Sequence, residues 1–540
     1  MDPLLILIAF IFGFAVYRVG LPPLVGYLIA GFALQALGIQ GGENLETIAD
    51  MGVMLLLFTI GLKLKLKTLA RPEIWAGASI HMFVTVLVFG AAIFALGSAG
   101  ISAFAGLDFK LSLLVAFALS FSSTVFAVKV LEERGEMASL HGRVAIGILI
   151  MQDIFAVLFL TFSTGKIPSP WALALVAGLI AARPLLIAML NQVGHRELVL
   201  LFSIFLALGL GAAGFDFVKL KPDLGALFMG ILLAGHPKTE EMSDALLSIK
   251  DLFLVGFFLT IGLAGAPTLQ SFGIASLLMV AVIFKVVLFF VLLSRFKLRA
   301  RTSLLGTLSL ANYSEFGLLV AAIGVKNGWI GPEWLITIAI ALSISFIVAS
   351  PLNTAAHTIY ERWSKRLNPF DSKTRHPDDQ PLDPGDAEIA VFGIGRIGAA
   401  AYDDMRDKYG EIVIGIDFNS EVVEKQQQAG RNVIVGDASD IDFWDRAIAG
   451  GSGKIRLVIL TMPDHKANIN AIEELAQRQF KGFIAAMAMF DDEVEELKQA
   501  GAHAAYNIYA QAGFGFAEHV NQAMGDEAED REQRTEDRGQ

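Results

Sequence analysis

A carboxylate and a neighbouring amide stand in the middle of one apolar run, where polar side chains are costly. Gln152 and Asp153 are flanked on both sides by Ile, Leu, Met, Phe, Ala and Val. A charged group at the centre of a membrane costs about 2.5 to 3.5 kcal/mol on insertion scales. A carboxylate in such a cavity can hold a proton or a cation, but not both together, and this competition is sufficient to couple their movements. The sequence therefore predicts a shared proton and cation site at Asp153, with the Gln152 amide oxygen as a ligand.

Other polar residues interrupt other apolar runs. Lys285 lies in the middle of one run, and it either neutralises Asp153 or braces broken helices. Hydroxyl, amide and carboxyl groups lie together in two further runs, at Ser122, Ser123, Thr124, Asn312 and Glu315. For these five residues a role in holding helices together is the alternative to ion ligation, and for Asp153 the alternative is a structural pair with Lys285. Because Gln152 adds no titratable group, we expect exchange of one proton for one monovalent cation without net charge movement.

The elements that must hold these residues are membrane-spanning helices. Hydrophobic residues make up 54% of the 540 residues and charged residues only 18%, which excludes a purely soluble protein. A spanning helix needs about 20 mostly apolar residues. Polar and Gly/Pro breaks divide the chain up to about Tyr360 into thirteen runs, at 3–18, 22–39, 50–64, 75–98, 111–130, 144–164, 168–190, 196–214, 220–236, 250–265, 271–294, 302–325 and 330–358.

The two halves of this region resemble each other. Pro22, Leu24 and Gly31 have counterparts in Pro222, Leu224 and Gly230, and the sequence FTIGL at 58–62 returns as LTIGL at 259–263. About seven helices separate the copies, so the halves would cross the membrane in opposite senses, as in the inverted repeats of many transporters. Chance recurrence of short Gly and Leu motifs is the alternative. The polar segments at 120–124 and 309–315 occupy matching positions in the two halves, which predicts broken helices that cross.

Charges give the orientation and exclude several functions. With the N-terminus outside, inward loops hold nineteen Lys and Arg and outward loops five, and cytoplasmic loops are the ones enriched in these residues. The first run has no basic leading segment or cleavage site, so we expect a retained helix.

The composition also excludes several functions. From Ala387 onward the chain has 15 basic and 28 acidic residues, and this excess of negative charge argues against nucleic-acid binding. The absence of cysteine excludes disulfides, thiolate catalysis and cysteine-ligated zinc.

A different kind of domain follows a Pro- and Asp-rich linker. A strand at 388–392 leads into Gly393-Ile394-Gly395-Arg396-Ile397-Gly398 and then a helical stretch, and the next strand ends in Asp417, 19 positions beyond the last of these glycines. A third strand precedes Gly436-Asp437-Ala438, and further strands follow at 457–460 and 483–486. Strands that alternate with helices predict a parallel sheet with helices on both faces.

The glycines and Asp417 point to a nucleotide. Gly393 provides a tight turn, Gly395 lets a phosphate approach the helix N-terminus, and Gly398 lets helix and strand pack closely. Asp417 would accept ribose hydroxyls and repel a 2′-phosphate, so NAD(H) or AMP is favoured over NADP. No catalytic His and Asp pair has a recognisable spacing, which favours a regulatory nucleotide site over a dehydrogenase.

Together these motifs resemble the Kef-type potassium efflux systems of the bacterial cation:proton antiporter-2 family, from the first helix to about residue 520. The residues at 122–124, 152–153 and 314–316, with Lys285, stand where that family has its transport-core motifs. The glycines, Asp417, Asp437 and Ala438 match its domain regulating potassium conductance.

The resemblance implies a homodimer in the bacterial inner membrane that exports potassium in exchange for protons. It also implies potassium bound at Asp153 and Gln152, an adenine nucleotide (AMP or NAD(H)) in the cytoplasmic domain, and gating by glutathione and its adducts. Glutathione-gated members carry an Ala-Arg-Ala-Arg run after the fifth strand. Here Met487 and Met489 replace the arginines, so the fork-shaped donors for a glutathione carboxylate are missing.

We therefore expect a multi-span α-helical membrane domain of about 13 helices at 1–360 and a flexible linker at 361–386. A cytoplasmic α/β Rossmann-like domain is expected at 387–522, with a disordered charged tail at 523–540. The predicted function is a nucleotide-regulated potassium/proton antiporter that works by alternating access and is not an enzyme. Sodium/proton exchange and a ligand-gated potassium channel are the alternatives, although the chain lacks the Thr-Val-Gly-Tyr-Gly filter of potassium channels.

Overall fold

A computed structural model gives the fold of the chain in two compact units. The first unit comprises Met1–Val130 and Val144–Arg375, and the second comprises Leu131–Arg143 and His376–Gln540. The residues that the structure describes are 3–39, 41–63, 69–101, 104, 106–134, 136–137, 139–162, 169, 171–194, 197–220, 222–372, 374, 376–379, 385–436, 438, 444, 454–517 and 520.

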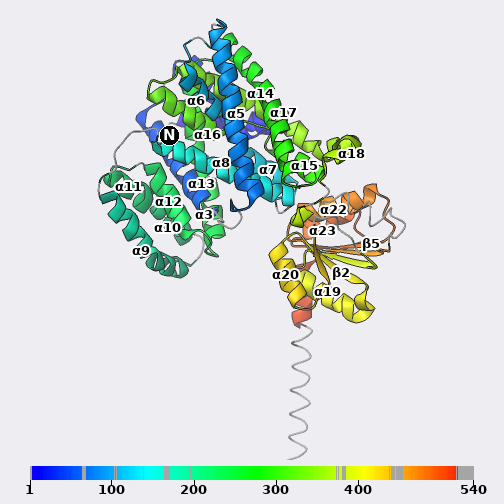
Figure 1. Cartoon of the computed structure of the whole chain (residues 1–540). Helices are drawn as coiled ribbons and strands as arrows, with labels where there is room; N and C mark the ends of the chain where they lie inside the picture. The colour runs from blue at the N-terminus through cyan, green and yellow to red at the C-terminus, as the bar shows by residue number, and fades with distance from the viewer. Residues whose placement is uncertain are drawn as a thin grey trace, which may run out of the picture. The chain divides into compact units, whose positions relative to one another are not determined.

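The first unit is entirely helical among its described residues (Figure 1). Its helices are α1 (Pro3–Arg18), α2 (Pro23–Ala36), α3 (Glu43–Lys63), α5 (Pro72–Ser98), α6 (Phe109–Ser120), α7 (Thr124–Glu133), α8 (Leu140–Phe162), α9 (Trp171–Gln192), α10 (Glu197–Ile204), the π-helical stretch η2 (Phe205–Ala213), α11 (Gly214–Phe217), α12 (Pro222–Leu233), α13 (Thr239–Leu263), α14 (Leu269–Arg295), α15 (Ala300–Ser309), α16 (Glu315–Lys326), α17 (Pro332–Thr354) and α18 (Ala356–Leu367). The boundary with the second unit falls within α7 and α8.

Local sequence explains where several of these helices begin. Proline stands in the first turn of α2, α5 and α17, where its missing N–H would have no intrahelical partner. The Asp108 carboxylate accepts the Leu111 N–H at the start of α6. Thr268 and Ser271 form a reciprocal capping box at the start of α14. Such caps satisfy backbone donors that the helix itself leaves unpaired.

Each of the thirteen predicted runs overlaps one or more of the described helices. Among the described residues, seven helices are long and apolar enough to cross a membrane: Glu43–Leu62, Pro72–Ser98, Phe109–Leu131, Trp171–Gln192, Glu197–Phe217, Leu269–Arg295 and Pro332–Thr354. The segments Glu241–Leu247 and Ile249–Leu263, which meet at a bend of 44°, raise this to eight if they form one span. Three shorter apolar helices, α1, α2 and α12, accompany them. The multi-span helical class is confirmed, and the count of thirteen spans stays a prediction.

Glycines from the two halves of the predicted repeat meet each other in pairs. A Cβ atom on Gly31 of α2 would lie 2.7 Å from the Cα of Gly262 on α13. A Cβ atom on Gly230 of α12 would lie 2.9 Å from the Cα of Gly61 on α3. In the predicted repeat, Gly31 corresponds to Gly230 and Gly61 corresponds to Gly262. Each contact therefore joins equivalent positions: the first glycine of one half meets the second glycine of the other half. This reciprocity fits the inverted repeat.

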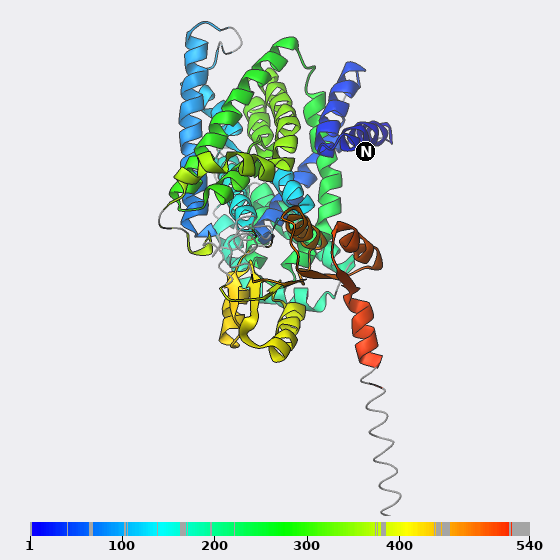
Figure 2. The same ribbon diagram turned by 90° about the vertical axis from the view of Figure 1, so that its right-hand side faces the viewer.

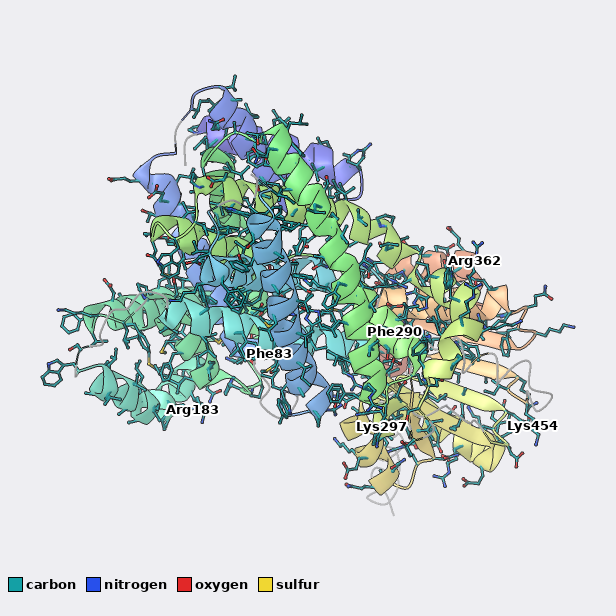
Figure 3. All side chains as sticks on the ribbon, turned by 45° about the horizontal axis from the view of Figure 1, so that its top comes forward. Phe83, Arg183, Phe290, Lys297, Arg362 and Lys454 are labelled. Carbon is teal, nitrogen blue, oxygen red and sulfur yellow. The ribbon has the colours of Figure 1, made fainter. Side chains whose placement is uncertain are left out.

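Two basic side chains near the ends of these helices are exposed. Lys297, in the turn between α14 and α15, and Arg362, on α18, both extend away from the ribbon (Figure 3). Both belong to the basic residues that the sequence analysis assigned to the inward side. Phe290, near the end of α14, packs edge-on against Phe370 with ring centroids 5.5 Å apart.

The second unit contains a six-stranded parallel sheet with the strand order β3-β2-β1-β4-β5-β6. Its strands are β1 (Ile389–Phe392), β2 (Val413–Asp417), β3 (Val433–Val435), β4 (Leu457–Leu460), β5 (Phe483–Ala488) and β6 (Ala504–Asn507). The helices α19 (Arg396–Tyr409) and α20 (Ser420–Gln428) cover one face, and α22 (His465–Gln477) and α23 (Asp491–Ala500) cover the other (Figures 1 and 2). The predicted Rossmann-like fold is confirmed, and β6 is a strand that the sequence analysis did not find.

Two predicted segments need comment. α18 extends to Leu367 and so enters the stretch at 361–386 that was expected to be a flexible linker, because Ala356 and Tyr360 give the helix a buried face. The predicted tail at 523–540 lies outside the described residues. The exact domain boundaries therefore stay predictions.

Candidate functional site

Two helices of the first unit are broken where the sequence analysis placed its polar segments. α6 ends at Ser120 and α7 begins at Thr124, while α15 ends at Ser309 and α16 begins at Glu315. The Ser123 hydroxyl accepts the Phe126 N–H at 3.2 Å, and the Ser314 hydroxyl accepts the Phe316 N–H at 3.1 Å. Serine therefore caps the second helix of each broken pair, which explains why the chain restarts a helix at these points.

Side chains of one break bond to the other break. The Ser122 hydroxyl donates to the Leu310 carbonyl at 2.8 Å, and the Ser123 N–H donates to Oδ1 of Asn312 at 2.7 Å. The Ser123 hydroxyl also donates to Oε2 of Glu315 at 2.8 Å. Three hydrogen bonds thus fix the two breaks at a single crossing. Residues separated by nearly two hundred positions in the sequence form one site.

Asp153 of α8 lies next to this crossing and is completely buried. The Thr124 hydroxyl donates to its carboxylate, at 3.2 Å from Oδ2. The neighbouring Gln152 accepts the Ser122 N–H on Oε1 at 2.8 Å, and its Nε2 is buried without a hydrogen-bond partner among the described residues. The amide oxygen predicted as an ion ligand is therefore engaged with the α6–α7 break.

Lys285 of α14 is also completely buried. Its Nζ donates to three carbonyls of the two breaks, those of Leu119 at 3.3 Å, Phe121 at 2.7 Å and Asn312 at 2.9 Å. Among the described residues no ion pair joins Lys285 to Asp153. The contacts correspond to the second of the two roles considered for Lys285, in which it braces the broken helices.

The buried charged side chains lie at ends of the half-helices whose potential has the opposite sign. Lys285 lies at the C-terminal ends of α6 and α15, where unpaired carbonyls make the potential negative. Asp153 and Glu315 lie at the N-terminal ends of α7 and α16, where unpaired N–H groups make it positive. The crossing can therefore keep opposite charges buried close together. It can also present carboxylate, hydroxyl and amide oxygens to a cation.

Sequence reasoning missed part of this support. The Tyr313 hydroxyl donates to the Leu278 carbonyl at 2.5 Å, and the Tyr313 N–H donates to the Ser345 hydroxyl at 3.0 Å. Lys285 Nζ lies 5.0 Å from the centre of the Tyr313 ring. Tyr313 stands inside the polar segment at 312–315, so its position was visible in the sequence. Its partners on α14 and α17 were not.

The glycine-rich turn of the second unit has the geometry that a nucleotide phosphate requires. Gly393 has a φ of 84°, which favours glycine, and a Cβ there would lie 2.9 Å from the Met462 nitrogen. A Cβ on Gly398 would lie 2.1 Å from the Gly393 carbonyl oxygen. A Cβ on Gly395, at the N-terminus of α19, would meet nothing within 4 Å. Two of the glycines are needed for packing. The third leaves open space at a helix N-terminus, where the first backbone N–H groups have no intrahelical partner, as in a phosphate site. Arg396 and Ile397 form the first turn of α19.

The predicted ribose ligand lies at the end of β2. Burial raises the pKa of the Asp417 carboxyl above its ordinary value of 3.8, and the N–H groups of Asn419 and Ile394 and the charge of Arg143 oppose that rise. Ala438 is buried after β3, while Asp437 lies outside the described residues. Thr461, after β4, donates its hydroxyl to the carbonyls of Phe392 and Gly393 at 2.7 and 2.9 Å. Thr461 thus holds the turn, a role that the sequence analysis did not assign.

Broken helices that cross at a buried acid, in a chain that also carries a Rossmann-like domain, are the arrangement expected of a membrane cation/proton exchanger. Comparison with known families gives the same result. Residues 5–354 match the family described as "Sodium/hydrogen exchanger, transmembrane", and residues 389–508 match the TrkA-N domain. The chain belongs to the sodium/hydrogen exchanger family. The members of this family are transporters, which confirms that the chain is not an enzyme.

Similar proteins with curated descriptions cover nearly the whole chain. The glutathione-regulated potassium-efflux system proteins KefC of Cronobacter sakazakii and Salmonella schwarzengrund are each 27% identical over 513 residues, covering 90% of this chain and 78% of theirs. The resemblance to Kef-type systems with a C-terminal regulatory domain is thereby confirmed.

Solved structures match the two parts of the chain separately. The sodium proton antiporter MjNhaP1 of Methanocaldococcus jannaschii matches 68% of this chain and 96% of its own, with 14% identity and a TM-score of 0.45. The TrkA-N domain of the inner membrane protein ybaL of Escherichia coli matches 25% of this chain and 96% of its own, with 18% identity and a TM-score of 0.22.

Proposed function

We propose that the protein exchanges potassium for protons across the bacterial inner membrane and that Asp153 holds the two ions in turn. The proposal is supported most directly by the surroundings of Asp153, a completely buried carboxylate whose hydrogen-bond donor is the Thr124 hydroxyl at the crossing of two broken helices. A carboxylate in such a place has either a proton or a cation as its partner. Alternating access of this one site to the two sides of the membrane then couples the two fluxes.

Potassium as the transported cation is supported by the relatives, which are named as potassium-efflux proteins. The ligands at hand are oxygens of Asp153, Thr124 and Glu315, and oxygen ligands suit a hard monovalent cation. Gln152 contributes by holding the Ser122 N–H, which fixes the broken helix beside Asp153.

We also propose that exchange is electroneutral. The Nζ of Lys285 is hydrogen-bonded to backbone carbonyls of the broken helices, and Lys250, buried on α13, pairs with Asp251 at 2.9 Å. Among the described residues, neither lysine is paired with the Asp153 carboxylate. Replacing a proton on Asp153 by one monovalent cation keeps the charge of the site constant.

The experiment is proton movement in liposomes that contain the purified protein, driven in turn by potassium and by sodium gradients. Potassium-driven exchange that Asp153→Asn abolishes and that does not respond to membrane potential is the expected result. The matched control is Asp216→Asn, which changes an exposed carboxylate on α11 and should leave exchange unchanged. Sodium-driven exchange of equal rate would contradict potassium selectivity. Potassium flux without proton movement would contradict the antiporter and support a channel.

For the second unit we propose that an adenine nucleotide, AMP or NAD(H), regulates this exchange. The open space beside Gly395 and the buried carboxylate of Asp417 support such a ligand at the carboxyl ends of β1 and β2. A bound nucleotide would supply phosphate charge to the N-terminus of α19 and ribose hydroxyls to Asp417. Titration of the full-length protein with AMP, NADH and NADPH tests this, and tight binding of NADPH would contradict the role of Asp417.

The orientation of the membrane domain is also part of the proposal. The N-terminus lies outside and the nucleotide domain in the cytoplasm, as the loop charges favour. Accessibility of single cysteines to a membrane-impermeant reagent tests it directly, because the natural chain has no cysteine.

We propose that the protein works as a homodimer. Exposed aromatic side chains follow one another along β6 and the helix at 508–517, with Tyr506, Tyr509, Phe514 and Phe516 between 57% and 72% exposed. An apolar surface of this kind marks an interface, and a second copy of the chain is the occupant proposed here. Light scattering of the detergent-solubilised protein should give twice the chain mass, and Phe514→Ser with Phe516→Ser should shift it towards the monomer.

Glutathione control, the property for which the relatives are named, is not proposed for this chain. Met487 is buried within β5, and the Met489 N–H is bonded to the Glu493 carboxylate at 2.7 Å. Neither side chain can pair with a carboxylate as an arginine does. We expect exchange rates to be the same with and without glutathione adducts.

A further inference from the structure

Helix α18 follows directly on a helix that is suited to cross the membrane. α17, which is long and apolar enough for a span, ends at Thr354, and α18 begins at Ala356. Ala356 is buried in a small apolar cluster with Leu305 and Leu308 of α15. Tyr360, one turn further along α18, is also buried. One side of α18 is therefore packed on the membrane domain, and the helix begins where a span ends.

The exposed surface of α18 is basic. Arg362, Lys365 and Arg366 are exposed, and Glu361 is the single acidic residue of the helix. Three positive charges and one negative charge give the helix a charge of 3 − 1 = +2. Figure 3 shows Arg362 extending away from the ribbon. Among the described residues, no ion pair joins the three basic side chains to a carboxylate. Their charge is therefore available to an anionic partner.

An exposed indole lies among these charges. Trp363 is 48% exposed, and the Arg366 guanidinium lies 5.1 Å from the centre of its ring. Tryptophan is enriched where a membrane meets water, because its ring is apolar while its N–H can donate to a polar partner. A guanidinium that stacks on the ring still presents N–H donors to a phosphate. Trp363 and Arg366 together therefore suit a layer of phospholipid headgroups.

Further basic side chains lie near the end of α14. Arg295 and Lys297 are both exposed, and they precede α15, which packs against both α14 and α18. The loop charges assign these two residues and the basic residues of α18 to the same, inward side of the membrane. Anionic lipids are concentrated in the cytoplasmic leaflet, where they attract basic segments next to a span.

We propose that α18 is an interfacial helix that binds anionic phospholipids, with Arg362, Lys365 and Arg366 on the headgroup phosphates and Trp363 within the headgroup layer. Each basic residue next to anionic lipid contributes about fivefold in affinity. The acidic second unit is the alternative partner for this charge. The start of α18 directly after a span and its exposed indole favour the lipid. Lipid binding by α18 is independent of which cation the protein exchanges.

The first test is equilibrium binding of fluorescently labelled phosphatidylglycerol to the full-length protein in detergent. Phosphatidylglycerol should bind more tightly than phosphatidylcholine and more weakly at high salt, and free glycerol phosphate should not displace it. Arg362→Gln combined with Arg366→Gln should weaken binding about 25-fold, whereas Arg362→Lys combined with Arg366→Lys should keep it. The matched control, Lys425→Gln with Lys466→Gln, removes the same charge at exposed positions of the second unit. Unchanged affinity in the double glutamine variant, or displacement by glycerol phosphate, would overturn the proposal.

The second test measures what surrounds α18 in a bilayer. The natural chain has no cysteine, so Trp363→Cys can carry a single spin label. In liposomes that contain phosphatidylglycerol, the ratio of access by oxygen, which concentrates in lipid, to access by an aqueous nickel chelate should be higher than for a label at Lys425→Cys, an exposed position of the second unit. An equal ratio at the two positions would place the helix in water and overturn the proposal. Low access by both reagents at Trp363→Cys would also overturn it, because a protein surface would then cover the helix.

Discussion

The Ser123 hydroxyl donates a 2.8 Å hydrogen bond to Oε2 of Glu315, and this bond joins the α6–α7 break to the first residue of α16. Ser314 approaches the same oxygen at 3.4 Å. The second oxygen, Oε1, is buried and has no hydrogen-bond partner among the described residues. A buried acceptor without a partner costs about 1 to 3 kcal/mol, and a bound cation would recover that cost. Glu315 is therefore expected to act as a cation ligand beside Asp153.

Glu315→Gln should weaken cation binding without removing exchange. The amide keeps the shape of the side chain and can still accept the Ser123 hydroxyl, but the negative charge beside the cation is lost. We expect the KM for potassium to rise at least about tenfold, which corresponds to about 1.4 kcal/mol. The KM is measured from proton movement in liposomes at increasing potassium. Glu333→Gln changes an exposed carboxylate of α17 and serves as the control. An unchanged KM in Glu315→Gln would assign Glu315 to helix packing alone.

Lys285→Met should destabilise the protein as well as stop transport. The change leaves the Leu119, Phe121 and Asn312 carbonyls buried without their donor. At about 1 kcal/mol or more for each orphaned group, the loss is at least about 3 kcal/mol. Thermal unfolding in detergent measures it, with Lys326→Met at an exposed position of α16 for comparison. Wild-type stability combined with lost exchange would show that Lys285 serves transport and not the crossing.

The sequence was sufficient to find the polar residues of the crossing because apolar runs make each of them conspicuous. Ser122, Ser123, Asn312 and Glu315 interrupt such runs, and the structure brings all four together. The partners of Lys285 could not be predicted, since they are backbone carbonyls, which every residue has. Which carbonyls lose their intrahelical bonds depends on where each helix ends, and sequence gives helix ends only to within a few residues.

The paired glycines of the repeat should respond alike to substitution. Gly31→Ala places a Cβ 2.7 Å from the Cα of Gly262, and Gly230→Ala places one 2.9 Å from the Cα of Gly61. Each change forces two helices apart and should cost about 1 to 3 kcal/mol in thermal unfolding measurements. Gly178→Ala and Gly273→Ala are matched controls, because a Cβ at either helix position meets nothing within 4 Å. We expect these two to be neutral or slightly stabilising. Loss of stability at Gly31 but not at Gly230 would contradict the reciprocal contact.

In the nucleotide domain the candidate site could be predicted from the sequence because most of its residues belong to one short motif. The glycine spacing and Asp417 lie within a single strand–helix–strand unit, so their arrangement follows from order along the chain. Thr461 bonds the glycine-rich turn from the end of β4, a more distant segment, and no local pattern marks it. β6 escaped notice because Ala504 and Ala505 give it little β-branched character.

Nucleotide binding should weaken at acid pH because of Asp417. Burial raises the pKa of this carboxyl above 3.8, and only the ionised form accepts two ribose hydroxyls. Binding should therefore be complete at neutral pH and fall as the pH drops through the raised pKa, at a higher pH than for an ordinary aspartate. Calorimetric titration with AMP at a series of pH values measures this. Asp417→Asn should bind weakly with no pH dependence in the same window. A pH dependence that persists in this variant would point to another titrating group.

Gly395→Ala and Gly398→Ala should separate nucleotide binding from folding. A Cβ on Gly395 meets nothing within 4 Å, so the domain should fold normally while the methyl group occupies the space of the phosphate beside α19. We expect AMP binding to fall at least about tenfold, by about 1.4 kcal/mol, with unchanged thermal stability. A Cβ on Gly398 would lie 2.1 Å from the Gly393 carbonyl and 2.6 Å from the Thr461 hydroxyl, so Gly398→Ala should lower stability by about 1 to 3 kcal/mol. Full AMP binding by a stably folded Gly395→Ala would place the nucleotide elsewhere in the domain.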